Sequence, residues 1–182
     1  MPRSTLRIPV LFAALAAALL SALLAGPASA ITPAAPPTLR LDGIGPLRLG
    51  MRSAAALRTG WLARRGRGCE LGGPPIPVTY RLTGPRAPGG VVGIAEFRFG
   101  RLRSLSFTRG VRTALGVVPG STRQRQMVAR YRRAGFAVRA QFVDVFAGTF
   151  VTVRRGRRQV LGGFARRGVV RTLGIPHVPT CE

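Results

Sequence analysis

Hydrophobic positions change their pattern twice along this chain. Residues 10–24 form one apolar run that only Ser21 interrupts. Residues 31–37 read Ile-Thr-Pro-Ala-Ala-Pro-Pro and have no periodicity, which is typical of an extended tether. From Thr38 onward, short segments with helical or alternating spacing are separated by turns rich in glycine and proline. The pattern predicts a leader, a tether over 31–37 and a folded part that begins near Thr38.

Two segments of the folded part have the spacing of short helices. In the first, Ser53 can cap a helix whose inward residues are Leu57 and Trp61, and Gly60 weakens that helix by about 1 kcal/mol. The second has capping-box spacing at Ser121 and Gln124 and a C-terminal glycine at Gly135. Its apolar stripe consists of Met127, Val128 and Tyr131. Helices this short need a sheet to pack against.

Segments with partial alternation of β-branched and aromatic residues follow each predicted helix and indicate antiparallel strands. After the first helix these are 78–82, 91–99 and 102–107, with turns at 88–90 and 100–101. After the second helix they are 140–146, 149–154, 159–164 and 169–173. Residues 97–102 predict a hairpin with Phe97 and Phe99 on one face.

The chain also matches itself at nearly constant offsets. Residues 47–51 align with 117–121 at an offset of 70, and Leu57 and Trp61 then align with Met127 and Tyr131. Residues 100–107 align with 168–175 at an offset of 68. Two matches in the same order predict a duplicated unit of about 70 residues. The predicted fold class is α+β, with two tandem repeats over 38–110 and 111–182, each a short helical segment followed by an antiparallel β-meander.

The N-terminal 30 residues have the three parts of a secretory signal peptide. Arg3 and Arg7 supply a basic start, the apolar run follows, and residues 28–30 read Ala-Ser-Ala, a cleavage pattern. The alternative is an uncleaved membrane anchor, but the run is mostly alanine and falls short of about 20 strongly apolar residues. We expect cleavage after residue 30, with secretion to the cell envelope or extracellular space and no transmembrane anchor in the mature chain.

Two cysteines, Cys69 and Cys181, lie in the predicted mature region. In an oxidising compartment, a pair far apart in sequence is most simply one disulfide, and free catalytic thiols are the weaker interpretation. A loop of that length would contribute about 4–5 kcal/mol to stability in the chain-entropy model.

The formal net charge is +24, with 29 basic and five acidic residues. Without Arg3 and Arg7 of the leader, 27 basic residues remain and the net charge is +22. All basic residues are arginine, and lysine and asparagine are absent, which indicates a GC-rich genome. That bias does not explain the scarcity of acids, so a surface attractive to polyanions is expected.

Two arginine groups are candidate anion-binding patches. The first lies around Tyr131 and consists of Arg123, Arg125, Arg130, Arg132 and Arg133. The second lies in a predicted turn and consists of Arg154, Arg155, Arg157 and Arg158. A solvated basic face is the alternative interpretation of either group. Suitable partners are anionic cell-wall polymers, phospholipid head groups or an acidic protein, whereas an exported chain without a known binding module disfavours nucleic acid.

The segment 47–55, Leu-Arg-Leu-Gly-Met-Arg-Ser-Ala-Ala, resembles the opening turn and helix of a group of exported bacterial proteins. The group includes the small barrel-assembly lipoprotein and, in tandem form, the beta-lactamase inhibitory proteins of actinomycetes. Residues 120–122 are similar to a second copy of this turn. The resemblance implies an actinobacterial secreted protein with tandem helix-plus-sheet repeats. The lipidated cysteine of the lipoprotein relatives is absent here, and this chain is far more basic than the inhibitors.

Catalytic chemistry finds little support in the sequence. His177 is the single histidine and lies in a proline-rich C-terminal segment, where a surface position is expected. A triad of His177 and Asp144 with Ser104 or Ser121 lacks the Gly-x-Ser-x-Gly elbow. One histidine and scattered acids do not form a zinc site, and no cofactor is expected. The leading hypothesis is a non-catalytic secreted binding protein with an unknown, anionic partner. The alternatives are an inhibitor of an extracellular enzyme and, third, a secreted hydrolase.

Overall fold

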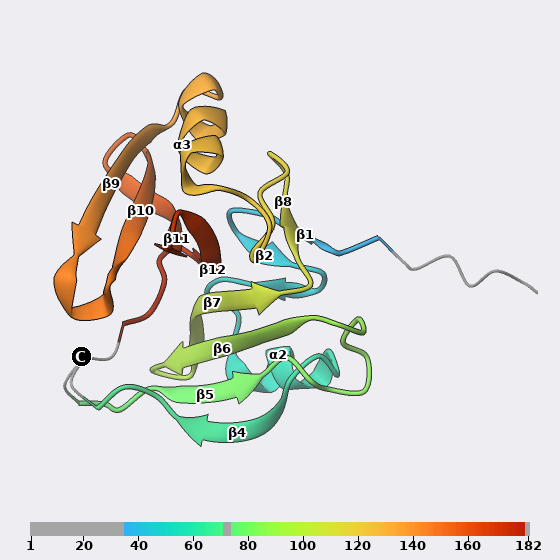
Figure 1. Cartoon of the computed structure of the whole chain (residues 1–182). Coiled ribbons are helices and arrows are strands. Elements are labelled where there is room, and N and C mark those ends of the chain that lie inside the picture. The colour runs from blue at the N-terminus through green and yellow to red at the C-terminus, as the bar shows by residue number, and fades with distance from the viewer. Residues whose placement is uncertain (1–34, 71–73, 181–182) are drawn as a thin grey trace, which may run out of the picture. The chain divides into compact units, whose positions relative to one another are not determined.

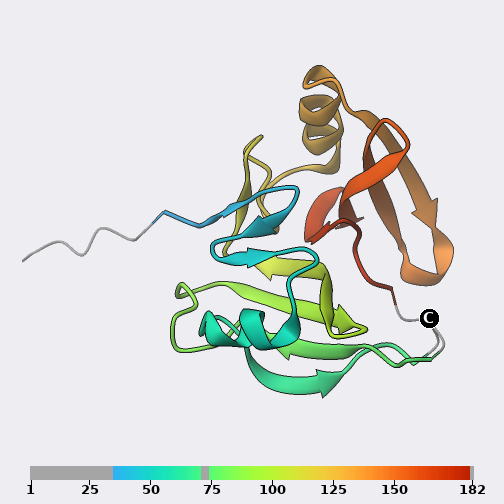
Figure 2. The same ribbon diagram turned by 180° about the vertical axis from the view of Figure 1, so that it is seen from behind.

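The computed structural model of the chain describes residues 35–70 and 74–180, and Figures 1 and 2 show this part from two opposite sides. The predicted signal peptide, most of the predicted tether and Cys181 lie outside the described residues. The described part consists mainly of two β-sheets with two α-helices, so the α+β class is confirmed. None of its helices is long and apolar enough to cross a membrane.

The larger sheet has eight strands, and every neighbouring pair is antiparallel. In spatial order they are β4 (Ala63–Arg67), β5 (Val78–Arg81), β6 (Val92–Arg98), β7 (Arg101–Arg109), β12 (Val169–Ile175), β11 (Arg158–Arg166), β10 (Gly148–Arg155) and β9 (Ala137–Val143). The β7–β12 ladder at its centre joins Phe107, Ser106 and Leu105 to Leu173, Gly174 and Ile175. Four strands from each half of the chain therefore meet at one short ladder.

The smaller sheet has four two-residue strands, in the order β3 (Leu47–Arg48), β2 (Gly43–Ile44), β1 (Thr38–Leu39) and β8 (Arg112–Thr113). The β1–β8 pair is parallel and joins the start of the fold to the middle of the chain. None of these four strands was predicted from the sequence, and neither was β4. Strands of two residues are too short for an alternating pattern, and β4 reads Ala-Arg-Arg-Gly-Arg.

The two helices are α2 (Ser53–Arg58) and α3 (Gln124–Arg133). The predicted caps were wrong by one or two positions, because Arg52 and Arg123 occupy the N-cap positions. At α3 the Gln126 side chain accepts a hydrogen bond from the backbone N–H of Arg123 at 3.0 Å. The left-handed Gly135 after α3, with φ of 81°, is confirmed as part of the helix end.

The prediction for the buried side of α2 was partly wrong. Leu57 is 38% exposed, and the buried residue of the helix is Ala56. Trp61 is buried as predicted, but it follows the helix, which ends before the left-handed Gly60. A six-residue helix has fewer than two turns, so it buries one narrow stripe.

Each helix begins beside a hairpin of the larger sheet, and the same backbone bonds hold both junctions. The Ser53 N–H donates to the Gly100 carbonyl and the Gln124 N–H donates to the Gly168 carbonyl, at 2.8 and 2.9 Å. The Gly50 N–H donates to Leu102 and the Gly120 N–H donates to Val170, both at 2.7 Å. The β6–β7 and β11–β12 turns are therefore fixed against the helix N-termini in the same manner.

One hydrophobic core extends between the helices, the smaller sheet and one face of the larger sheet. Tyr131 of α3 is 3% exposed and contacts Phe136 edge to face at 5.5 Å. Burial raises the pKa of the Tyr131 hydroxyl above its ordinary value, and a side-chain hydrogen bond with Thr113 lowers it by a smaller amount. Tyr131 is thus a core residue that favours the uncharged state.

Candidate functional site

The face of the larger sheet that points away from α3 is called the open face here. Gly163 of β11 lies under Met127 of α3, since a Cβ at Gly163 would meet the Met127 side chain at 2.9 Å. Side chains alternate between faces along a strand, so Gly162 and Phe164 point to the open face. Phe150 of β10 lies opposite Phe164 in register and shares that face.

Three aromatic rings gather on the open face at the β9–β11 end, and we call them the phenylalanine cluster. Phe150 and Phe164 have ring centroids 5.0 Å apart, and Phe146 contacts them at 5.4 and 6.4 Å. A Cβ at Gly148 would lie 2.4 Å from the Phe164 ring, so glycine leaves room for the cluster. All three rings are half-buried. They form a preassembled apolar contact surface.

The C-terminal segment 176–180 crosses the same face. A Cβ at Gly174 would lie 2.1 Å from the His177 carbonyl oxygen, and a Cβ at Gly162 would lie 2.7 Å from the Val178 nitrogen. Gly162 and Gly174 are opposite each other in the β11–β12 ladder. Two adjacent glycines therefore let the backbone of this segment lie directly on the sheet.

The first predicted arginine patch is divided between the two ends of α3. Arg123 and Arg125 are exposed at the N-terminus. Arg130, Arg132 and Arg133 belong to the last turn, where positive charge suits the helix dipole. Arg130 donates to the Gly116 carbonyl at 2.6 Å and Arg132 donates to the Val138 carbonyl at 3.3 Å. These two side chains therefore bind neighbouring backbone segments of the same chain. The five arginines are thus divided between the two ends of α3, and anion binding by either group stays a prediction.

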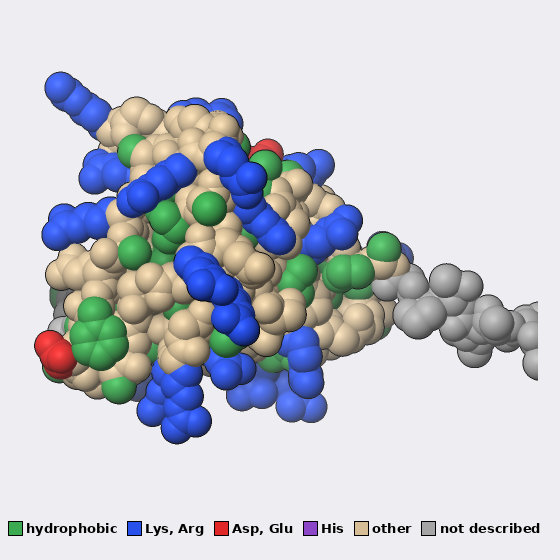
Figure 3. All heavy atoms as spheres, turned by 45° about the horizontal axis from the view of Figure 1, so that its top comes forward, with side chains coloured by type: hydrophobic (Ala, Val, Ile, Leu, Met, Phe, Trp, Pro, Cys, Tyr) green, Lys and Arg blue, Asp and Glu red, His purple; other side chains and the backbone are tan. Residues whose placement is uncertain are grey.

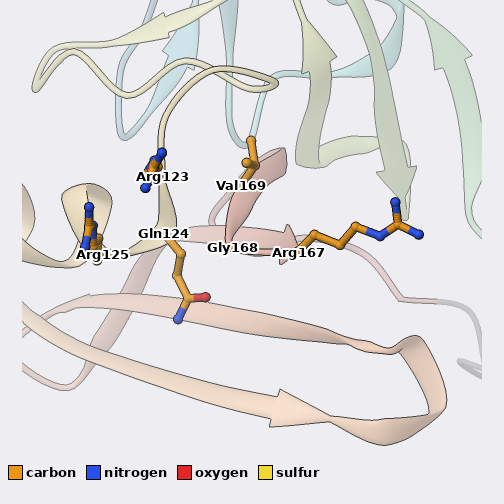
Figure 4. Close-up of a pocket in the computed structure, with 6 residues that line it drawn as sticks. All are labelled: Arg123, Gln124, Arg125, Arg167, Gly168 and Val169. Atoms are coloured by element: carbon orange, nitrogen blue, oxygen red, sulfur yellow. The ribbon is translucent and has the colours of Figure 1, made fainter.

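Arg123 and Arg125 instead lie at a shallow cavity of about 500 Å³ beside the β11–β12 turn. Its lining residues are Arg123, Gln124, Arg125, Arg167, Gly168 and Val169 (Figure 4). Arg167 was not predicted from the sequence, because it is close to Arg123 and Arg125 only in space. Figure 4 shows the Arg167 side chain extending away from the other two arginines. The cavity is basic, but its guanidinium groups do not converge on one point.

The second arginine patch lies around the turn in which Gly156 and Arg157 join β10 to β11, and Arg154, Arg155 and Arg158 are residues of the two flanking strands. Arg154 donates to the Arg157 carbonyl, and the Arg155 guanidinium lies 5.2 Å from the centre of the Phe136 ring. Arg155 and Arg158 line a cavity of about 340 Å³ that also contains Asp42. On the face drawn in Figure 3, basic side chains are spread over the surface and do not gather at one place.

The residues considered for catalysis occupy separate environments. His177 is exposed, whereas Ser104 of β7 is 1% exposed and its hydroxyl has no hydrogen-bond partner among the described residues. Asp144 lies in a short 3-10 helix, η1 (Asp144–Phe146), beyond the edge strand β9. In residues 35–70 and 74–180, no three histidine, cysteine or acidic side chains group as metal ligands would.

The disulfide between Cys69 and Cys181 stays a prediction because Cys181 is outside the described residues. Cys69 lies two residues after the end of β4. In Figures 1 and 2 the described segment after β12 runs toward the β4–β5 end of the sheet, the direction that this pairing requires.

Comparisons with protein-family models, with curated proteins and with solved structures gave no match to this chain. The functional argument therefore depends on the residues themselves.

Proposed function

We propose that this protein is a secreted, non-catalytic binding protein that holds a macromolecular partner on the open face of its larger sheet. The phenylalanine cluster is the observation that carries the proposal. Phe146, Phe150 and Phe164 are half-buried rings assembled on a face without a helix. Rigid aromatic surface of this kind is typical of protein-binding sites.

The charge of the chain favours an acidic partner. Without Arg3 and Arg7 of the leader, the chain has 27 basic residues against five acids, and two of those acids already form ion pairs on the surface. Asp42 pairs with Arg40 and Arg48, and Glu70 pairs with Arg67, at 3.4–3.7 Å. Most arginine charge is therefore left for solvent or a partner. Long-range attraction between opposite charges accelerates association and penalises basic competitors.

We also propose that the two halves, 38–110 and 111–182, are tandem copies of one unit. The strand order β4-β5-β6-β7 followed by β12-β11-β10-β9 is what two copies meeting at their last strands would form. The matching bonds from Ser53 to Gly100 and from Gln124 to Gly168 support the same proposal. It extends the resemblance to the tandem beta-lactamase inhibitory proteins, and an inhibitor of an extracellular enzyme is the second candidate function.

The decisive experiment is affinity capture from culture supernatant with immobilised protein lacking residues 1–30. We expect wild-type protein to retain a specific acidic protein, and the double variant Phe150→Ser with Phe164→Ser to lose it. Phe142→Ser is the matched control, because Phe142 is 60% exposed on β9 but lies opposite Thr149, on the other face. Capture that is equal in all three proteins, or absent from wild type, contradicts the proposal. If the captured protein is an enzyme, an activity assay with added wild-type protein tests inhibition.

Export and the absence of catalysis have separate tests. N-terminal sequencing of the protein from culture medium should begin at Ile31. A protein retained in the membrane with an intact leader contradicts secretion. For the hydrolase alternative, any activity found in a substrate screen is compared with that of His177→Ala, and a loss of that activity would favour catalysis.

A further inference from the structure

A second surface lies on the face that carries α2, at the β6–β7 turn. Two adjoining cavities of about 380 and 440 Å³ share Arg65, Ile76 and Val78 and form one groove along the β4–β5 hairpin. We call it the turn groove, and its main lining residues are Arg65, Ile76, Val78, Tyr80, Phe97 and Phe99.

The apolar floor of the turn groove is held in place by the fold. Tyr80 and Phe97 contact edge to face at 5.6 Å, and Phe97 lies opposite Val78 in the β5–β6 ladder. Phe97 is 3% exposed and belongs to the hydrophobic core. Arg98 Nε donates to the Pro75 carbonyl at 3.3 Å and fixes the wall beside Ile76. A ligand would therefore meet a preformed surface.

Phe99 on the rim has no structural explanation within the described fold. Its φ is 53°, in a two-residue turn with Gly100, and its side chain is 71% exposed. A left-handed backbone is costly for a bulky residue, and asparagine or glycine suits such a turn better. Ile76, across the groove, is 38% exposed. An aromatic side chain placed in solvent at such a position points to an external contact.

We infer that the turn groove binds an extended acidic segment of a partner protein, with an apolar side chain between Phe99 and the floor. Arg65 and Arg67 line the groove and are exposed, as is Arg64 between them and Ala63, and Arg67 also pairs with Glu70 at 3.4 Å. These arginines can pair with carboxylates on either side of the apolar anchor. The strand β4 ends the strand order, so its outer edge can pair with an extended segment. This inference does not depend on the open-face proposal, because the two surfaces lie on opposite faces.

The test measures fluorescence anisotropy of a dye-labelled peptide containing Glu-Phe-Glu-Ile-Glu. In one control peptide serine replaces Phe and Ile, and in another glutamine replaces Glu. We expect the parent peptide to bind at least about tenfold more tightly than either control. Phe99→Ser and Arg65→Glu should each weaken binding by about tenfold. Val145→Ser and Arg139→Glu, two exposed positions at the β9 end, should leave it unchanged.

Three results would overturn the inference. Equal binding of all peptides would show charge attraction without an apolar site. Unchanged binding by Phe99→Ser would remove the turn groove from the interaction. If the peptide does not bind, but vesicles containing phosphatidylglycerol bind wild type and not Phe99→Ser, the aromatic rim belongs to a membrane contact instead. Circular dichroism of each variant verifies that the sheet is intact.

Discussion

The β6–β7 and β11–β12 turns of the larger sheet can be compared residue by residue. Phe99 and Gly100 have φ of 53° and 67°, and Arg167 and Gly168 have φ of 51° and 72°. Both turns receive a backbone bond from the first residue of the adjacent helix. Yet the first turn borders the apolar turn groove, and the second borders the basic cavity of α3. Glycine and main-chain hydrogen bonds fix the backbone of each turn. The exposed side chain can therefore differ between the turns, and it determines whether the adjoining surface is apolar or basic.

Among the changes that compare the two turns, replacing Phe97 by alanine should reduce the stability of the protein most. Alanine is the residue at position 165, which occupies the same place relative to the second turn, two residues before Arg167. Phe97 is 3% exposed in a core packed around its ring, so we expect a loss of about 3–5 kcal/mol in the free energy of unfolding. Chemical denaturation measures it. Ala165→Gly is the matched control, with an expected loss of about 1 kcal/mol. Similar losses for both would contradict the different packing of the two halves.

The two turn glycines should respond alike. No atoms lie within 4 Å of a Cβ built at Gly100 or Gly168, so only the left-handed backbone opposes a side chain. We expect Gly100→Val and Gly168→Val each to destabilise the protein by about 1–2 kcal/mol in chemical denaturation. Losses that differ by more than about 1 kcal/mol would show that the turns are not equivalent.

Alkaline pH should change the contribution of the second half to stability more than that of the first half. In the proposed alignment of the two halves, Tyr131 corresponds to Trp61, which does not ionise. Because burial raises its pKa above 10.0, the folded state holds the hydroxyl proton at pH values where the unfolded chain loses it. The Tyr131 contribution is therefore constant below pH 10.0 and declines as pH rises through the folded pKa. The difference in melting temperature between wild type and Tyr131→Phe should therefore shrink as the pH rises above 10.0. Parallel profiles would contradict the assignment.

Exchange of the two exposed tip residues should have the smallest effect on stability. Phe99→Arg and Arg167→Phe change side chains that are mainly in solvent, so each should alter the free energy of unfolding by less than about 0.5 kcal/mol. Their effect should appear on a heparin column, where Phe99→Arg elutes at higher salt than wild type and Arg167→Phe at lower salt. Equal elution of wild type and both variants would show that these tips do not contribute to polyanion binding.

The strands with alternating residues could be predicted from the sequence, and so could α3, whose Met127 and Tyr131 are buried as expected. The strand β4 could not, because its burial is nearly uniform and the backbone pairing with β5 defines it. The two-residue strands of the smaller sheet are likewise defined by partners that are distant in sequence.

The candidate sites were harder to predict from the sequence than the strands and helices. Phe150 and Phe164 lie in predicted strands, but their contact depends on the register around Gly156. Phe150 lies six residues before Gly156 and Phe164 lies eight residues after it, because the register shifts between Val153 and Arg154, so distance from the turn alone does not pair them. The first arginine group shows the opposite case. Its residues are close in sequence along α3 but have different surroundings, so Arg130 donates to the Gly116 carbonyl while Arg123 is exposed to solvent.

The backbone of residues 176–180 over Gly162 and Gly174 limits the footprint of any partner on the open face. It runs across the β11–β12 ladder and leaves the phenylalanine cluster on a strip formed by β9, β10 and part of β11. Three neighbouring strands span about 10 Å, which is close to the diameter of one helix. A broad, flat partner would collide with the crossing segment. The shape of the molecule thus selects partners that project one narrow element, such as a loop, a helix or an extended strand.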